Sequence, residues 1–308
     1  MTVTSSRPQM AAMRASLRGY LAAAHPSQRF LYRVAALFAV NAVLHAVVFL
    51  ADDRPWDGRG SWRQPLAFSL AFALILPSLA WVMDFLPRRK KLGWAVSGTL
   101  GAAALGTVFF IALQTWRDQA AFFPEDLPFD QGVWTGMQIG IGLIVLAIVV
   151  EAGWAMTRVE APPSFKWAMR AGLVLMVAGL AMGGLMIAEG LSQEELGPVD
   201  SPVTFGEAGL VVFPHLLSLH SLVALAVLVW FLSFTAWPEG RRTRVLQVAL
   251  AAYVMLIAVS LAEALAGRAP FEPVGLAAVL FWTSVALFVA AFAATFTELW
   301  RTRNRPRA

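Results

Sequence analysis

The sequence predicts an all-α integral membrane protein, a bundle of eight transmembrane helices with both termini on the cytoplasmic side. The first observation is composition: 58% of the 308 residues are hydrophobic and only 14% are charged. Charged residues make up about a quarter of an average soluble domain, so the chain is far too apolar to be one. The second and third observations are a series of long apolar runs and the alternation of charge between them.

Each apolar run is long enough to cross a bilayer, which takes about 20 mostly apolar residues. The runs cover residues 30–51, 64–86, 92–115, 132–156, 166–189, 209–237, 245–266 and 273–300. The chain therefore divides into a basic segment 1–29, a single eight-helix domain 30–300 and a basic tail 301–308. No soluble domain of useful size remains, so a functional site must lie between the helices or in short loops.

The loops alternate in charge, and this alternation predicts the orientation. Arg88, Arg89, Lys90 and Lys91 stand between the second and third spans, and most other basic residues fall on the same side. The opposite loops hold only Arg54, Arg59, Arg63, Arg117 and Arg268, together with most of the acidic residues. Because basic residues near span ends are retained in the cytoplasm, both termini are expected there. The positive charge then faces anionic inner-leaflet lipid, and it requires no nucleic-acid partner.

The first 29 residues are expected to lie on the cytoplasmic surface of the membrane. Apolar residues recur there at helical spacing with arginines beside them, which is typical of an interfacial helix: Met10, Met13, Arg14, Leu17, Arg18 and Leu21. No short apolar core with a small-residue cleavage site is present in this segment, so we do not expect a cleavable signal peptide. The chain also contains no cysteine, which excludes disulfides and thiolate chemistry.

Small residues four positions apart indicate where helices pack closely in lipid. Gly136 with Gly140, and Gly179 with Gly183, form two such pairs. Without a side chain at these positions, two helix backbones can approach each other.

Polar residues inside the spans are the candidates for function. Burying a polar or ionisable group in the membrane costs free energy, and such groups usually face the interior of the helix bundle or a cavity in it. They are Asn41, His45, Gln138, Glu151, His215, Ser218, His220 and Glu263. Counted along the helices, His45 and His215 lie at similar depth in the outer half of the bilayer. We therefore predict an outward-facing pocket between the first, fourth and sixth spans, which Asn41, Gln138 and Ser218 would also line.

Two histidines at matching depth on different helices are typical of membrane cytochromes that bind b-type haem. His45 and His215 are the expected iron ligands, and His220 could instead hold a quinone head group or pass a proton. Glu151 and Glu263 are candidates for a proton path. The alternative interpretations are that Glu151 reaches the inner surface or pairs with Arg158, and that Glu263 is simply solvated.

Other classes of function stay open. The polar pocket would also suit a small-molecule transporter or binding protein, and all the polar residues could serve packing in a non-catalytic assembly subunit. The sequence contains no zinc-protease HExxH motif, no GxSxG nucleophile motif and no phosphate-binding loop. The sequence therefore predicts no metal site and does not decide whether the protein is an enzyme.

Two short motifs resemble those of an uncharacterised family of multi-pass bacterial membrane proteins. The segment Ser61–Ser69, SWRQPLAFS, is similar to the Trp-x-Lys-Pro pattern with which the second span of that family begins. The segment Phe213–His220, FPHLLSLH, is similar to its Pro-His-x4-His run in the sixth span. This chain departs from the family at Gln64, where Lys is usual, and at Val223, where Gln is common. The resemblance implies the same fold and a location in the bacterial inner membrane, and it draws attention to His215 and His220.

Overall fold

The computed structural model describes residues 7–58, 60–124, 127–194 and 203–303 of the chain. These residues fold into α1 (Arg7–Ala23), α2 (Pro26–Ala51), α3 (Arg63–Val82), the short 3-10 helix η1 (Met83–Phe85), α4 (Lys90–Trp116), α5 (Pro128–Arg158), α6 (Pro163–Glu194), α7 (Val212–Leu219), α8 (Ser221–Ser233), α9 (Glu239–Leu265) and α10 (Gly275–Arg303). The distal parts of the predicted terminal segments, residues 1–6 and 304–308, lie outside the described residues.

The described helices confirm the predicted all-α membrane bundle. Seven of them are long and apolar enough to cross a membrane: α2, α3 continued by η1, α4, α5, α6, α9 and α10. The sixth predicted span differs from expectation, because it is divided into α7 and α8, which meet at His220 with a bend of 40°. If this bent pair is counted as one span, the described part of the chain provides eight.

The first span begins four residues earlier than the sequence predicts, at Pro26 rather than Phe30. His25 caps this helix. Its imidazole ring accepts a hydrogen bond from the backbone N–H of Ser27, and the backbone N–H of His25 donates to the side-chain oxygen of Gln28. Such reciprocal bonds satisfy backbone donors that have no partner within the helix. Pro26, whose φ angle suits a first helical turn, supports the same start.

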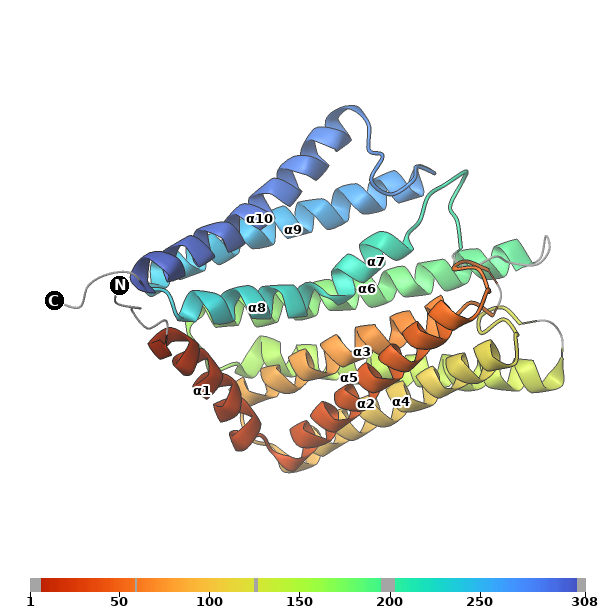
Figure 1. Cartoon of the computed structure of the whole chain (residues 1–308), viewed down its shortest axis with the longest axis horizontal. Helices are drawn as coiled ribbons and strands as arrows, with labels where there is room; N and C mark the ends of the chain where they lie inside the picture. The colour runs from red at the N-terminus through yellow and green to blue at the C-terminus, as the bar shows by residue number, and fades with distance from the viewer. Residues whose placement is uncertain (1–6, 59, 125–126, 195–202, 304–308) are drawn as a thin grey trace.

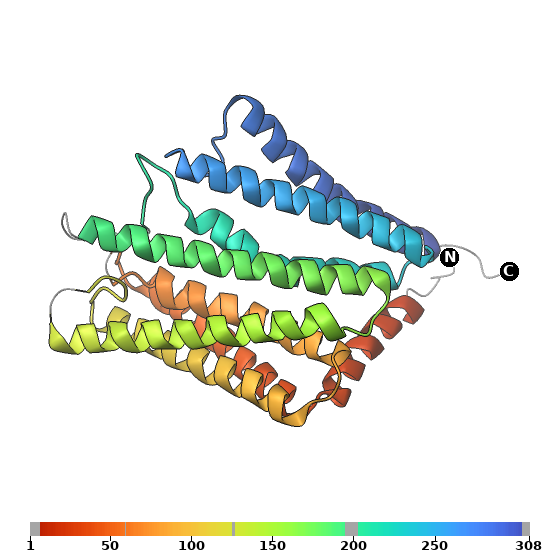
Figure 2. The same cartoon turned by 180° about the vertical axis from the view of Figure 1, so that it is seen from behind.

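The helices run up and down, so that the loops collect at two ends (Figures 1 and 2). We call one end the basic end; it holds α1 and the charged residues Arg88, Arg89, Lys90, Lys91, Arg158, Arg241 and Arg301. We call the other the acidic end; it holds Asp52, Asp53, Asp57, Asp118, Glu207 and Glu272. The predicted segregation of charge is therefore present in the fold.

The spans form two groups. Helices α2, α3, α4 and α5 pack together in the first, whereas α6 packs against α7, α8 and α9 in the second, with α10 outside against α9. Contacts of α5 with α6 and of α3 with α8 join the groups (Figure 1). One large apolar core, which includes Leu79, Leu100, Met169 and Leu225, spans the junction.

The predicted close approaches at the glycine pairs are confirmed. A Cβ added to Gly140 would collide with the Thr107 side chain of α4, and one added to Gly179 would lie 2.9 Å from Ser218 of α7. A fifth position, Gly172, is equally crowded, because a Cβ there would lie 2.7 Å from the Cα of Leu222 in α8. Glycine therefore sets the distance from α6 to both halves of the bent span.

Helix α1 lies across the basic end at a large angle to the bundle (Figure 1). Ser16 accepts a hydrogen bond from the indole of Trp230 in α8, and Tyr20 packs against Phe85 of η1, so α1 bridges both groups of spans. Met10, Leu17 and Leu21 remain about half exposed on it, at 51%, 51% and 55%. An exposed apolar stripe of this kind suits the membrane surface.

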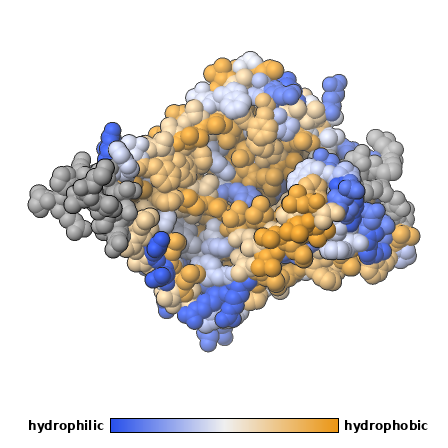
Figure 3. Space-filling model, in the orientation of Figure 1, coloured by the Kyte–Doolittle hydropathy of each residue, from blue (hydrophilic) through white to orange (hydrophobic). Residues whose placement is uncertain are grey.

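The exterior of the bundle is apolar. On the face shown in Figure 3, hydrophobic residues cover much of the middle of the molecule, whereas strongly hydrophilic residues gather towards the ends. Leu50 and Leu276 are exposed to 84% and 73%, which would be unfavourable in water. The surface is that of a multi-pass membrane protein in contact with lipid.

Candidate functional site

His45 belongs to a tightly connected cluster near the acidic end. Its Nδ1 donates to the carbonyl of Asn41 at 2.9 Å, and its Nε2 accepts from the indole of Trp116 in α4 at 3.3 Å. The ring is only 2% exposed and also packs against Trp62. Both ring nitrogens of His45 therefore have protein partners, which is the arrangement of a structural histidine.

The loop after α2 closes over this cluster. Asp52 accepts hydrogen bonds from Arg54 at 2.8 Å and from the indole of Trp62 at 2.7 Å. Arg54 in turn lies over the Trp62 ring, with 4.0 Å between the guanidinium carbon and the ring centroid. The hydrogen bonds from Arg54, followed by the one from Trp62, hold the pKa of the Asp52 carboxyl below its ordinary value. At neutral pH the loop is thus fastened by an ionised carboxylate.

His215 lies in the other group of spans. Its Nδ1 donates to the carbonyl of Gly179 in α6 at 2.7 Å, which fastens α7 to α6. The ring fills the space left by Gly183, since a Cβ there would lie 3.1 Å from the imidazole. Ser218, one turn further along α7, is fully buried with its hydroxyl directed to the sulfur of Met182 at 3.9 Å.

His220 stands at the bend itself. Its Nδ1 donates to the carbonyl of Leu216 at 2.9 Å. Neighbouring hydroxyl groups satisfy other carbonyls of the bent segment: Tyr253 donates to Leu217 at 2.7 Å, and Ser221 donates to Ser218 at 2.7 Å. A bend within a span is tolerated when such side chains pair the backbone groups at the bend.

The structure does not bring the predicted pocket residues together. Helix α2 has its main contacts with α3 and α4, and α7 has its main contacts with α6 and α9, so His45 and His215 face different helices. Asn41 donates a hydrogen bond to Ser69 of α3 at 2.7 Å, and Gln138 lies on the exposed face of α5. The common role of His45 and His215 in binding b-type haem stays a prediction.

Glu151 is the most unusual of the predicted residues. Its side chain is 0% exposed on α5, and neither carboxylate oxygen has a hydrogen-bond partner among the described residues. The alternatives of contact with the inner surface or pairing with Arg158 are therefore wrong. Since a polar group buried without a partner is destabilising, a carboxyl group here is a candidate for function.

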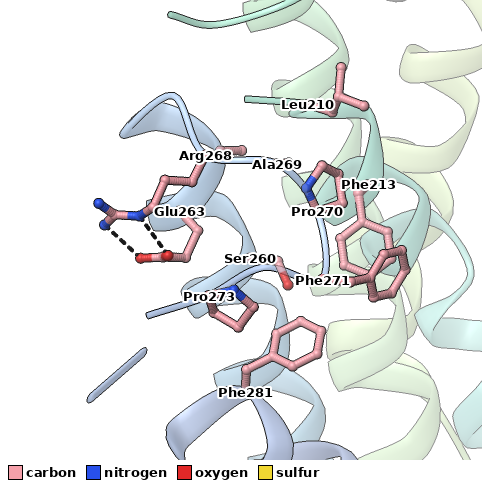
Figure 4. Close-up of a pocket in the computed structure, with 11 residues that line it drawn as sticks. Leu210, Phe213, Ser260, Glu263, Arg268, Ala269, Pro270, Phe271, Pro273 and Phe281 are labelled. Atoms are coloured by element: carbon pink, nitrogen blue, oxygen red, sulfur yellow. Dashed lines mark hydrogen bonds and ion pairs between the residues drawn. The ribbon is translucent and has the colours of Figure 1, made fainter. Parts of the chain in front are cut away.

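Glu263 is held in an ion pair rather than solvated, as Figure 4 shows. Its two oxygens accept from Arg268 at 2.7 and 2.8 Å, at the end of α9. The pair borders a pocket of about 10 Å³. The buried hydroxyl of Ser260, which has no hydrogen-bond partner within the described part of the chain, is directed into it between Phe271 and Phe281. This space is close to the minimum for one water molecule, so the pocket suits a bound water better than a substrate.

A larger cavity, of about 110 Å³, opens at the basic end, and we call it the basic-end cleft. The start of α2, the segment from η1 to the first turns of α4, and one side chain of α5 form its walls. Its polar and charged lining residues are His25, Ser27, Gln28, Asp84, Arg88, Arg89, Lys90 and Trp154. The sequence predicts none of these as site residues, and it explains the basic run by the orientation of the spans.

Two polar atoms in the wall of the basic-end cleft have no hydrogen-bond partner in the part of the chain that the structure describes. Gln28 donates to Oδ1 of Asp84 at 2.7 Å and to the carbonyl of Ala80 at 2.8 Å, which fixes the carboxylate in place. Oδ2 of Asp84 and Nε1 of Trp154 are buried without a hydrogen-bond partner among the described residues. One acceptor and one donor are thus left for a ligand, and Arg88 is near enough for its charge to act on Asp84.

Comparison with known proteins adds no further assignment: no family model, no curated protein and no solved structure matches the chain. The class defined by the fold, a multi-pass membrane protein, therefore rests on the helices and their surface. The described residues contain no group of three or more His, Cys, Asp or Glu side chains placed to hold a metal ion. The resemblance of the two short motifs to a bacterial family stays a prediction.

Proposed function

We propose that this protein is a membrane carrier that binds a small charged ligand in the basic-end cleft. The observation that carries the proposal is a pair of polar atoms, Asp84 Oδ2 and Trp154 Nε1, in a cavity bordered by three basic side chains. Neither atom has a hydrogen-bond partner among the residues that the structure describes. Polar groups of native proteins are nearly always paired, so such atoms in a cavity indicate a missing partner. The expected outward-facing pocket is replaced in this proposal by a cleft at the opposite end.

The positive-inside rule supports an orientation with both termini in the cytoplasm, and the resemblance of the two short motifs supports a location in the bacterial inner membrane. The basic-end cleft would then open to the cytoplasmic side. Arg14 and Arg18 of α1, both exposed, lie at that end and favour contact with anionic inner-leaflet lipid.

Glu151 supports the proposal that the protein carries its ligand into the membrane and does not only bind it at the surface. It lies three residues before Trp154 on α5, hence about 4.5 Å further into the membrane at 1.5 Å per residue. A buried carboxyl one turn beyond a ligand cavity provides a second polar position along the same helix. Together with the bent α7–α8 segment, it resembles the interrupted, polar interior of membrane transporters in general.

The proposal is tested by thermal unfolding of the delipidated full-length protein in detergent. Adding a bacterial polar lipid extract is expected to raise the midpoint of unfolding. Ligand at 100 times its Kd stabilises the folded state by about 2.7 kcal/mol. The double variant Arg88→Gln/Arg89→Gln should lose most of this rise. Arg244→Gln, an exposed basic residue of α9 outside the cleft, is the matched control, and an equal response of both variants would contradict the proposal.

Binding of b-type haem is a second proposal, favoured by the orientation of the imidazoles. His215 and His220 each donate Nδ1–H to a backbone carbonyl, at 2.7 and 2.9 Å, which leaves Nε2 to act as a ligand. Iron-bound histidines are commonly held this way. Protein expressed with ample haem should show a Soret band that sharpens on dithionite reduction. The band should disappear in His215→Ala, which removes one of the two expected iron ligands, and persist in His25→Ala, whereas a featureless spectrum of the unmodified protein refutes haem binding.

A further inference from the structure

We infer that the ligand of the basic-end cleft carries a phosphate next to a primary amine, as in the head group of an aminophospholipid. This inference rests on the proposed function of the cleft and specifies its ligand. Arg88, Arg89 and Lys90 provide three positive charges at its border, and Asp84 provides one negative charge in its wall. The lining is therefore of mixed sign rather than uniformly basic.

A simple anion does not match this lining. It would pair with the basic side chains, but it would also lie beside the Asp84 carboxylate, whose free oxygen cannot donate a hydrogen bond. A simple cation would pair with Asp84, but it would be repelled by the three basic side chains at the border of the cavity. A ligand with both charges, a few bonds apart, satisfies Asp84 with its ammonium and the basic side chains with its phosphate.

The fixed position of Asp84 makes this selection specific. Gln28, which is itself only 5% exposed, holds Oδ1 with a 2.7 Å hydrogen bond. Oδ2 is left as the acceptor for an N–H donor, and the free indole N–H of Trp154 is left for an oxygen of the ligand. A quaternary ammonium has no N–H and could not replace the missing hydrogen bond, so the cleft should distinguish a primary amine from its trimethylated form.

The position of the cleft favours a lipid as the source of the head group. It lies where α2 and α4 begin and where η1 ends, which is the level of the membrane surface for helices that cross a bilayer. Helix α1 ends just before His25 and presents an apolar stripe beside the same end. A phospholipid could thus place its head group in the cleft while its acyl chains remain in the bilayer.

The test measures lipid binding to the delipidated full-length protein in detergent by native mass spectrometry. The probes are phosphatidylethanolamine, phosphatidylcholine and phosphatidylglycerol with the same acyl chains, together with water-soluble glycerophosphoethanolamine. Phosphatidylethanolamine should bind about tenfold more tightly than the other two lipids, the effect of one charge-assisted hydrogen bond. Asp84→Asn, which keeps the oxygen that Gln28 contacts, should abolish this preference. Glu160→Gln, a carboxylate at the same end but outside the cleft, should retain it.

The outcomes separate the two proposals. The inferred ligand class is wrong if the unmodified protein does not prefer phosphatidylethanolamine, or if Asp84→Asn keeps the preference. Even then, loss of all lipid binding in Arg88→Gln/Arg89→Gln would support the cleft as the binding site. If the arginine variant binds every lipid normally, the proposed function fails. Binding of glycerophosphoethanolamine as tight as that of the lipid would keep the head-group chemistry but refute a membrane source.

Discussion

Replacing Gly172 with alanine is expected to lower the free energy of unfolding by about 1–3 kcal/mol, the usual effect of inserting atoms into a closely packed interior. The added Cβ would lie 2.7 Å from the Cα of Leu222 and 3.2 Å from its Cβ. Because the nearest atom belongs to the backbone of α8, no side-chain rotation can relieve the contact, so α6 and α8 must move apart. Their separation would also lengthen the 2.9 Å hydrogen bond from Ser221 to the carbonyl of Gly172.

Gly184→Ala on the same helix is the matched control. A Cβ added there meets no atom within 4 Å, so the substitution should leave the midpoint of thermal unfolding unchanged or raise it. Alanine is favoured over glycine in a helix by about 1 kcal/mol, which gives the two variants opposite signs. Equal midpoints for Gly172→Ala and Gly184→Ala in detergent would show that α6 and α8 do not pack at this distance.

Gly172 shows how far the sequence predicts the packing. The pairs at Gly136, Gly140, Gly179 and Gly183 were expected from their four-residue spacing, and all four contact neighbouring helices. Spacing identifies the face of a helix that packs, but it does not identify the partner helix. Gly172 is crowded because Leu222 of α8 lies against it, and the sequence alone does not show which helix passes at that position.

The number of spans and the segregation of charge could be predicted because both depend on the length and composition of single segments. The arrangement of His45 and His215 could not be predicted. Counting along a helix gives the depth of His45 and His215, but it does not give the direction in which each side chain points. His45 faces Trp116 of α4 and His215 faces Gly179 of α6, so similar depth did not place them together.

The basic-end cleft was missed for a related reason. Arg88, Arg89 and Lys90 have a sufficient explanation as residues that orient the spans, and Asp84 falls at the end of an apolar run. Their connection to His25 and Gln28 arises only when α2 and α3 pack side by side and bring residues 28 and 84 within a hydrogen bond of each other. A contact between residues so far apart in the sequence cannot be read from local patterns.

Replacing Glu151 with methionine is expected to stabilise the protein, by about 1–3 kcal/mol, and so to raise the midpoint of unfolding in detergent. The carboxyl group is 0% exposed and its oxygens have no partner among the described residues. A buried polar group without a hydrogen bond costs about this amount, and an apolar side chain of similar length removes the penalty without creating a large cavity.

Glu263→Met is the matched comparison, since it removes the other glutamate that was predicted for a proton path. Glu263 accepts two hydrogen bonds from Arg268, so its loss should lower the midpoint. The decrease should be about 1 kcal/mol or less, because the Arg268 side chain is still 44% exposed and water can replace part of the interaction.

Opposite signs for these two glutamates would separate a structural carboxylate from a functional one. A residue whose removal stabilises the fold has no structural reason to be there, and proteins retain such residues where activity requires them. Glu151→Met should therefore unfold at a higher temperature and still bind lipid in the basic-end cleft, one turn away. It should no longer carry the ligand, because the Glu151 carboxyl that supports this step is gone. A lower midpoint for Glu151→Met would mean instead that the carboxyl has a partner in the membrane, and the second polar position along α5 would no longer support a carrier.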